Sequence, residues 1–496
     1  MPTIRFTQWL VAPCAASLLV FTASGAELLV PATYPTIQSA VDAAVDGDTI
    51  LVSSGTYAEA VLVQGKSIDL VGVDGAATTI VDGAGFASPV VEIGGDGLLD
   101  VGLKGLTLRN GSGKLTGTQR DGGGIHFAGW RLTVQQCVLD HNSATRRGGG
   151  AFLGAGAQAT WSDCVFSDNT CMGGSVASGA GVCMSPFGGT CAFAGCTFTG
   201  NVAMSTGNGG SGGGAFVLSA IFERCTFENN VAAIVSTPTS VKGGGGGLYA
   251  ADVVTLTDCH FTTNQGGGAA CFGGGDDVNM VCACTFTGNT GFPYGGGLLV
   301  NGANVALQQC SFTGNVSTKD GGALDVNIQA TLSAIECSFV GNEAINGGGV
   351  VVVGAKSASF TSCAFSRNVA DGVGGGMAVA AIGAGTTTEV ADCTISGNEG
   401  DAGGGVYVTM DGGLTVVDTL VCDNSPENFD GPWIDAGGND ICADGPPADI
   451  NGDGAVDGAD LGILLSQWST IGPAADLNND FVVDGLDLGL LLAGWT

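Results

Sequence analysis

The sequence predicts an all-β solenoid, a parallel β-helix of about twelve turns, followed by a small α-helical module of the EF-hand type. Three observations predict this architecture. One short string of residues recurs along most of the chain, 89 of the 496 residues are glycine without a Gly-X-Y period, and residues 449–496 contain two copies of one acidic loop. Because 45% of the residues are hydrophobic, the chain can also form a long continuous core.

The first 26 residues are predicted to be a secretory signal peptide. Arg5 supplies a positive charge, Trp9–Phe21 is apolar, and Ser24-Gly25-Ala26 offers the small residues typical of a cleavage site. No later segment reaches the roughly 18 apolar residues that a membrane-spanning helix needs. We therefore expect a secreted or cell-surface protein that begins at Glu27 and has no membrane span.

The recurring string is Cys-x-Phe-x-x-Asn, and it is followed by a glycine cluster and an apolar strand. Cys and Phe two residues apart point to the same side of a strand. The Asn is expected at a left-handed turn, and the glycines allow close backbone approach. Stacked copies therefore predict interior ladders of Cys, Phe and Asn. Eight strict copies begin at Cys164, Cys196, Cys225, Cys259, Cys284, Cys310, Cys337 and Cys363, and four looser copies end at Asn110, Asn142, Asn398 and Asn424.

This pattern resembles the right-handed parallel β-helix of the pectin-lyase-like superfamily. The pairing of glycine clusters with Phe-x-x-Asn is also similar to the repeats of chlamydial polymorphic outer-membrane proteins. The opening segment, residues 30–57, looks like the N-terminal cap of that superfamily, with Thr36 beginning a helix. One face of this helix would carry Ile37, Val41 and Ala44. The resemblance thus implies a right-handed β-helix with capped ends over residues 27–445.

The cysteines of the repeats are expected to be free. Stacked turns hold their Cβ atoms about 4.8 Å apart, which is longer than the usual separation in a disulfide. Cys422 and Cys442 bracket a stretch rich in Pro, Gly and Asn, and we predict that they form a disulfide closing the C-terminal end of the rod. Two further candidate pairings are Cys271 with Cys282, and Cys171 with either Cys183 or Cys191.

Residues 446–496 contain the most specific motif of the chain. Two twelve-residue loops, offset by 27 residues, are each followed by an apolar helix. Oxygens at loop positions 1, 3, 5, 7, 9 and 12 surround one point and suit Ca²⁺, so the loops predict two calcium sites. The second site should be weaker, because Phe481 replaces the glycine at position 6. The predicted ligands are Asp449, Asn451, Asp453, Ala455, Asp457 and Asp460 in the first loop, and Asp476, Asn478, Asp480, Val482, Asp484 and Asp487 in the second, with Ala455 and Val482 acting through their carbonyls.

The duplicated loop and helix resemble a type I dockerin, the calcium-folded module that docks onto cohesin domains. The resemblance implies a cohesin-like partner. The sequence departs from that family at loop positions 10 and 11, where Gly458-Ala459 and Gly485-Leu486 replace the hydroxyl pair often found there. Docking of the apolar helices on another surface protein is therefore an open alternative.

The charge of the chain limits its partners. A net charge of −32 makes nucleic acid and anionic membranes poor partners, because both require a basic face. Basic residues nevertheless cluster over the early repeats, where they form a candidate site for an acidic sugar chain. The cluster comprises Arg120, His126, Arg131, His141, Arg146 and Arg147, together with Asp121.

Two functions remain open at this level. The repeats are regular and carry no clear catalytic motif, which favours an extracellular β-helix that binds a polysaccharide or a surface, or mediates adhesion, and is displayed through its calcium module. The alternative is a carbohydrate-active enzyme, a pectate-lyase-like lyase or a glycoside hydrolase acting on polysaccharide, with acidic polysaccharide as the expected substrate. The fold resemblance does not choose between them.

Overall fold

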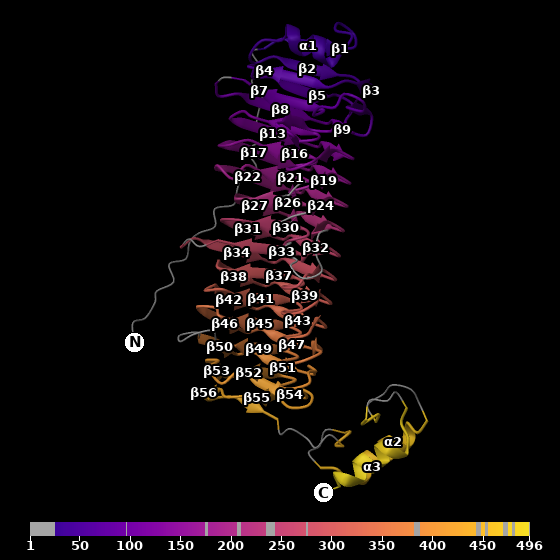
Figure 1. The fold of residues 1–496 in the computed structure, drawn as a ribbon, viewed down its shortest axis with the longest axis vertical. Helices are drawn as coiled ribbons and strands as arrows, with labels where there is room; N and C mark the ends of the chain where they lie inside the picture. Colours follow the sequence, from indigo (N-terminus) through magenta and orange to yellow (C-terminus); the bar gives the residue numbers. More distant parts are fainter. Residues whose placement is uncertain are drawn as a thin grey trace.

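The computed structural model describes residues 25–95, 97–173, 177–205, 210–234, 244–273, 276–380, 387–442, 448–451, 455–469, 475–478 and 482–495. Residues 27–442 form a rod in which successive turns of the chain stack on one another, and the strands of these turns form three long sheets along the rod (Figure 1). Neighbouring strands within each long sheet are parallel, as in β37, β41 and β45 (Leu298–Asn301, Leu324–Asn327 and Val350–Val353). The predicted parallel β-solenoid is confirmed.

Each complete turn contributes one strand to each of the three sheets, and the first and last turns contribute fewer. Sheet 1 contains β1 (Glu27–Val30), β2 (Thr49–Val52), β5 (Asp69–Gly72), β8 (Asp100–Lys104), β13 (Arg131–Gln135), β17 (Ala157–Ser162), β22 (Gly189–Ala194), β27 (Ser219–Glu223), β31 (Val254–Thr257), β34 (Val278–Cys282), β38 (Asn304–Gln308), β42 (Thr331–Ile335), β46 (Ser357–Thr361), β50 (Thr387–Ala391), β53 (Leu414–Val417) and β56 (Ile434–Asp435). Sheet 2 contains β3 (Gly55–Ala58), β6 (Thr79–Asp82), β9 (Thr107–Arg109), β14 (Val138–Asp140), β18 (Val165–Ser167), β23 (Thr197–Thr199), β28 (Thr226–Glu228), β32 (His260–Thr262), β35 (Thr285–Thr287), β39 (Ser311–Thr313), β43 (Ser338–Val340), β47 (Ala364–Ser366), β51 (Thr394–Ser396), β54 (Leu420–Cys422) and β57 (Asp440–Ile441). Sheet 3 contains β4 (Val61–Gln64), β7 (Val91–Gly94), β12 (Ile125–Phe127), β16 (Ala151–Leu153), β21 (Val182–Met184), β26 (Ala215–Val217), β30 (Leu248–Ala250), β33 (Ala269–Phe272), β37, β41, β45, β49 (Met377–Ala380), β52 (Val406–Val408) and β55 (Phe429–Asp430).

Shorter strands pair at the corners of the rod, and three helices complete the described residues. The short strands are β10 (Lys114–Thr116), β11 (Gln119–Asp121), β15 (Ser143–Ala144), β19 (Thr170–Met172), β20 (Ala177–Ser178), β24 (Val202–Ser205), β25 (Gly210–Ser211), β29 (Val231–Ile234), β36 (Thr290–Gly291), β40 (Val316–Ser317), β44 (Glu343–Ala344) and β48 (Val369–Ala370). The helices are α1 (Ile37–Ala43), α2 (Gly458–Ser466) and α3 (Gly485–Ala493). Among the described residues, no helix has both the length and the apolar character needed to cross a membrane.

The rod has more turns than the twelve repeats predict. Its three sheets have 16, 15 and 14 strands in the described part of the chain. In sheet 2, β3 and β6 lie before the first repeat, where the Cys-x-Phe-x-x-Asn string is missing, and β57 lies after the last one. Aliphatic side chains fill the interior at the N-terminal end, as in the buried column of Ile50, Leu70 and Leu103, so the turns continue without the motif.

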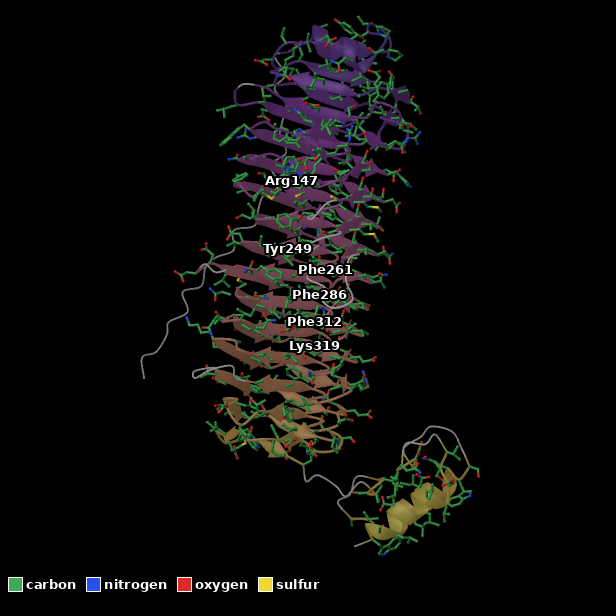
Figure 2. All side chains as sticks on the ribbon, in the orientation of Figure 1. Arg147, Tyr249, Phe261, Phe286, Phe312 and Lys319 are labelled. Atoms are coloured by element: carbon green, nitrogen blue, oxygen red, sulfur yellow. A yellow bond between two sulfur atoms is a disulfide. The ribbon has the colours of Figure 1, made fainter. Side chains whose placement is uncertain are left out.

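The predicted phenylalanine ladder runs through the core beside sheet 2. Eight buried rings stack face to face, with centroids 4.6 to 5.1 Å apart. Figure 2 shows three of them, Phe261, Phe286 and Phe312, one above the other. The cysteine two residues before each of these rings is buried as well, as in Cys310. Both interior ladders are therefore confirmed.

A column of eleven buried asparagines forms a continuous hydrogen-bonded ladder. Asn315 is typical: its N–H donates to Oδ1 of Asn342 (2.9 Å), its Nδ2 donates to the carbonyl of Phe286 (2.8 Å), and its Oδ1 accepts the N–H of Asn289 (3.0 Å). The ladder consists of Asn142, Asn169, Asn201, Asn230, Asn264, Asn289, Asn315, Asn342, Asn368, Asn398 and Asn424.

The expected left-handed conformation falls one residue earlier than predicted. Arg367, which precedes Asn368, has φ +54°, and Asp168, which precedes Asn169, has φ +51°. The bend is made by the preceding residue because the asparagine side chain must stay inside the rod to bond its neighbours. The glycine clusters serve the next corner. Gly321 has φ +64°, and a Cβ on Gly322 would collide with the carbonyl of Gly348 one turn further on.

Both ends of the rod are closed as predicted. Thr36 caps α1 in a capping box with Ser39, and the buried face of this helix includes Ile37 and Val41. Figure 1 shows α1 above the first strands, where it covers the open end of the core. At the other end, Cys422 and Cys442 form a disulfide with their Cα atoms 5.0 Å apart.

The other proposed disulfides are absent from the described structure. Cys271 on β33 belongs to the core, whereas Cys282 on β34 is partly exposed, so the two side chains lie on opposite sides of the wall. Cys171 packs among small alanines at a corner, and Cys191 points into the core from β22. The thiols of Cys171, Cys183, Cys191, Cys271 and Cys282 are all free.

We predict that Asn315→Ala destabilises the rod by at least about 2 kcal/mol, because it leaves the buried N–H of Asn289 and the carbonyl of Phe286 without their partners. Thermal unfolding followed by circular dichroism measures the effect. Thr287→Ala is the control, because Thr287 is exposed beside the same core ladder. Equal melting temperatures for the two variants would refute the structural role of the asparagine column.

Candidate functional site

One carboxyl group interrupts an apolar column on the outer side of sheet 3. We call this column the outer row: Tyr249, Ala270, Leu299, Asp325, Val351, Ala378 and Tyr407, which pair in register on successive strands. Its neighbours Leu324 and Val326 point into the core, so Asp325 points outward from β41. Nearby side chains nevertheless cover Asp325, which is only 1% exposed.

Asp325 lines an open pocket of about 470 Å³ on this face of the rod. The pocket combines a carboxyl pair, a lysine, side-chain amides and apolar groups, which is the mixture typical of small polar ligands. Its walls come from three consecutive turns, those of β37, β41 and β45, and the corners beside them. They consist of Tyr294, Asn301, Lys319, Asp320, Asp325, Asn327, Ile328, Gln329, Val351, Val353 and Gly354.

The surroundings of Asp325 favour its uncharged form. Burial is the main cause that raises the pKa of this carboxyl to about 8, and the nearby negative charge of Asp320 adds to it. A hydrogen bond from Nδ2 of Asn327 to Oδ1 of Asp325 (3.0 Å) and the charge of Lys319 act in the opposite direction and do not compensate. Within the described residues, Oδ2 of Asp325 and Oδ1 of Asn327 are buried without a hydrogen-bond partner.

The second carboxyl of the pocket is held in a charged network. Nζ of Lys319 lies 2.7 Å from Oδ2 of Asp320, and Nδ2 of Asn346 donates to Oδ1 of Asp320 at 2.9 Å. The hydrogen bond to Asp320 raises the pKa of Lys319, so the lysine stays protonated. The ammonium group also lies 5.2 Å from the ring centre of Tyr294. Figure 2 shows Lys319 on the face of the rod that also carries Tyr249.

The pocket thus contains two carboxyl groups with different surroundings, and the two groups are suited to different chemical roles. Asp325 keeps its proton near neutral pH and can act as a general acid, whereas Asp320 forms an ion pair with Lys319 and accepts a hydrogen bond from Asn346. Sequence inspection missed this pair. The available indication was Asp325 itself, which stands in Leu-Asp-Val where the adjacent turns have Leu-Leu-Val (298–300) and Val-Val-Val (350–352).

The predicted basic cluster is dispersed over three faces of the rod. His126 lies on β12 of sheet 3, Arg131 begins β13 of sheet 1, and His141 follows β14 of sheet 2. Arg131 pairs with Asp100 (3.2 Å), and Nδ1 of His141 lies 2.7 Å from Oδ1 of Asp140. These three residues, although close in sequence, therefore turn outward from different sheets, and the structure does not bring the whole predicted cluster to one face.

The remaining members of the cluster fasten the β10–β11 hairpin to the rod. Asp121 is 1% exposed and accepts hydrogen bonds from both Arg146 (Nε, 2.9 Å) and Arg147 (Nη2, 2.8 Å). Burial opposes its charge, but the two guanidinium groups outweigh burial and lower the pKa of Asp121. Arg120 donates to the carbonyls of Ala87 (2.6 Å) and Gly113 (2.7 Å). These contacts serve structure, since they occupy the charges that a ligand would need.

His126 has a buried ring nitrogen without a hydrogen-bond partner in the described structure. Its ring is 8% exposed and lies 5.5 Å from the ring of Phe152, and its Nδ1 has no partner there. Burial, aided by the charge of Lys114, lowers the pKa of His126, so the imidazole is neutral. A neutral, enclosed imidazole does not attract an acidic sugar.

The C-terminal residues form a duplicated helical unit with its own small core. The six buried core residues come in three pairs separated by 27 positions: Ala448 with Ala475, Val456 with Val483, and Leu464 with Leu491. The two loops therefore fold alike where they are described. Asp453 and Asp480, two of the predicted ligands, lie outside the described residues.

The last residue of each loop is fixed by backbone hydrogen bonds. Asp460 accepts the N–H groups of Asn451 (3.0 Å) and Asp457 (2.8 Å), and Asp487 accepts those of Asn478 (3.1 Å) and Asp484 (2.7 Å). Burial opposes the charge of each carboxylate, but these bonds prevail and lower both pKa values. Two charged, fully buried carboxylates at position 12 fit the requirements of a hard cation.

Comparison with known families agrees with the fold. Residues 105–284 and 220–441 match the family model described as a right handed beta helix region, and together these matches cover more than half of the chain. The chain belongs to this family. No curated protein sequence matches it significantly.

Three solved structures illustrate how distant the similarity is. The A-module of a mannuronan C-5 epimerase from Azotobacter vinelandii is 13% identical, with 82% of this chain and 94% of that chain covered and a TM-score of 0.35. The catalytic domain of a GH87 α-1,3-glucanase is 12% identical, with 84% and 69% covered and a TM-score of 0.28. A pectin methylesterase from Aspergillus niger is 11% identical, with 75% and 84% covered and a TM-score of 0.21. Similarity at this level concerns the fold alone.

We predict that Asp325→Asn makes the protein less sensitive to pH between about 4 and 8. The carboxyl has an ordinary pKa of about 3.9 in the unfolded chain and about 8 in the folded one, so its contribution to stability is complete below pH 4 and is lost as the pH rises to 8. Asn cannot ionise and keeps its hydrogen bond from Asn327.

Melting temperatures at pH 4, 6 and 8 measure this effect. The variant should gain stability relative to the wild type as the pH rises. Asp277→Asn, which removes an exposed carboxyl outside the pocket, should follow the wild type. A constant difference between Asp325→Asn and the wild type at all three pH values would contradict the prediction.

Proposed function

We propose that this member of the right-handed β-helix family acts on polysaccharide outside the cell and cleaves glycosidic bonds in the Asp325 pocket. The observation that carries the proposal is the pair of carboxyl groups in one open pocket, one held uncharged by burial and the other paired with Lys319. Glycoside hydrolysis requires this division between an acid and a carboxylate.

Each polar group of the pocket has a role in such a reaction. Asp325 donates its proton to the glycosidic oxygen as the bond to the anomeric carbon breaks. Asp320, which contacts Lys319 and Asn346, faces the positive charge that develops on the sugar ring. It accepts the proton of the water molecule whose oxygen bonds to the anomeric carbon. The amides of Asn301, Asn327 and Gln329 are suited to hydrogen bonds with sugar hydroxyls, and Tyr294 offers an apolar surface.

A second candidate function is binding without cleavage, as in an adhesin or a surface-binding rod. The low exposure of Asp325 favours it, because a carboxyl that is 1% exposed reaches a ligand only after its cover moves. The same pocket would then recognise the polysaccharide through its amides and Tyr294. Measuring both binding and cleavage in the same pocket variants separates the two functions.

The charge distribution favours an uncharged substrate. The net charge of −32 repels uronate chains, and Asp320 already neutralises Lys319 in the pocket. The basic cluster that favoured an acidic polysaccharide is occupied by contacts within the rod. We therefore propose a neutral glycan in place of the acidic one.

We propose that residues 446–496 bind Ca²⁺ through the two loops and dock the rod on a cohesin-like or other surface protein. The matched cores of the two halves and the buried carboxylates of Asp460 and Asp487 support calcium binding. Exposed apolar side chains on the helices support docking, namely Leu465 on α2 and Leu486, Leu490 and Leu492 on α3. The disulfide and residues 1–26 support secretion or display at the cell surface.

We predict that Asp325→Asn and Asp320→Asn each reduce kcat by about 10² to 10⁴-fold on the substrate polysaccharide, since each removes one half of the acid–carboxylate pair. The wild-type rate should also fall as the pH rises through about 8, where Asp325 loses its proton.

Reducing ends released from a panel of neutral glycans, pectin and alginate measure activity, and ultraviolet absorbance detects the unsaturated uronates that a lyase would release. Asp277→Asn should retain full activity. Full activity of Asp325→Asn would refute the assignment of the acid, and cleavage of pectin or alginate alone would refute the neutral substrate.

We predict two calcium-binding events in the full-length protein, the second weaker than the first, in isothermal titration after treatment with a chelator. Asp460→Ala should abolish the first and Asp487→Ala the second, because each removes the buried carboxylate that closes its loop. Hydrogen exchange of α2 and α3 should slow on calcium addition. An unchanged titration heat and exchange pattern would contradict the calcium loops.

A further inference from the structure

Three aromatic rings stack on the outside of the rod, apart from the core ladder. The rings of Phe216 and Tyr249 lie 5.2 Å apart, and those of Tyr249 and Phe272 lie 4.6 Å apart, with interplanar angles of 13° and 15°. None of the three belongs to the buried core, and each is partly exposed. We call them the outer stack.

The outer stack leads directly to the Asp325 pocket. Tyr249 stands in the outer row three strands before Asp325, which corresponds to about 14 Å along the rod at the spacing of neighbouring strands. Phe272 is closer still, because it pairs in register with Asn301, a wall of the pocket. Figure 2 shows Tyr249 and Lys319 on the same side of the rod, one above the other.

Core packing does not explain these rings. The interior of the same turns is already filled by the core ladder, with Phe227 and Phe261 stacked 4.7 Å apart. An outward position in a solenoid needs no aromatic residue, as Ala270 shows in the same row. Partly exposed aromatic rings next to a polar pocket are typical of ligand-binding surfaces.

We propose that the outer stack is a binding platform for the same glycan chain that enters the pocket, so that the chain lies along the rod and the substrate is a long, uncharged polysaccharide. This inference rests on the proposed function. The rings cover one another's faces and present their edges outward, and the apolar C–H groups of a sugar chain can pack against these edges. The platform has no charged side chain among its three rings, and this agrees with a neutral chain.

A polymer bound in this way occupies successive turns of the rod while one linkage lies at Asp325. Short oligosaccharides fill the pocket alone and gain nothing from the platform. The wild-type enzyme should therefore show a lower KM for long chains than for short ones, with similar kcat, because the additional contacts are remote from the reacting bond.

The decisive variants are Tyr249→Ala and Tyr249→Leu, compared with Tyr407→Ala. Tyr407 is a matched control, because it lies in the same outer row, three strands on the other side of Asp325, is partly exposed, and has no aromatic stacking partner in the described residues. Tyr249→Leu keeps an apolar side chain without the ring, so it separates loss of the platform from loss of stability. Melting temperatures are recorded for all variants.

We expect KM and the dissociation constant for soluble xylan, glucomannan or glucan to rise about tenfold in both Tyr249 variants, while kcat/KM on the corresponding tri- and tetrasaccharides and all constants of Tyr407→Ala stay unchanged. Equal effects of Tyr249→Ala and Tyr407→Ala, or equal effects on long and short chains, would overturn the platform and leave the proposed function intact. Full activity of Asp325→Asn would instead overturn the proposed function. A wild-type protein that neither cleaves nor binds any of these glycans would overturn both.

Discussion

The in-register stacking of successive turns is the constraint on which the whole rod depends. Each turn hydrogen-bonds to the next along the three sheets. The side chains of one column must therefore pack against one another at the spacing of neighbouring strands. The asparagine column shows how strict this is. A side chain such as Asn315 bonds the turn before it and the turn after it at once, and it does so without exposure to water. Substitution in one turn therefore affects two neighbours.

The same constraint explains where function can arise in such a rod. Interior columns repeat because packing and hydrogen bonding select one residue type, whereas outward positions are free to vary. A chemically active group is therefore most visible as a departure from its own column. Asp325 between Leu299 and Val351 is such a departure, and its apolar neighbours are also the reason that its proton is retained. The position of Asp325 in its column thus explains both where the carboxyl group lies and why it retains its proton.

Most of the fold could be predicted from the sequence, since the repeat fixes the columns and the columns fix the solenoid. The capping helix at Thr36 and the disulfide between Cys422 and Cys442 followed from local patterns as well. The site could not be predicted from clustering in sequence. His126, Arg131 and His141 are near one another in sequence but lie on or beside strands of different sheets. Asp325 and Asn301, in contrast, are 24 positions apart in sequence and line the same pocket. Register was needed to bring them together.

The electrostatics of the chain connect the choice of substrate to the chemistry of the site. An excess of negative charge disfavours a further carboxylate in the pocket, and Asp320 applies the same effect at short range. Binding of a uronate would add another negative charge beside Asp325 and strengthen its hold on the proton, at the moment when the proton must leave for the glycosidic oxygen. A neutral sugar displaces water from the pocket without that added charge. In the proposed reaction, Asp325 then transfers its proton as positive charge develops on the ring, with Asp320 and its lysine already in place. Burial keeps the proton on Asp325 in this proposed reaction, and the negative charge that adds to this effect also disfavours an acidic substrate.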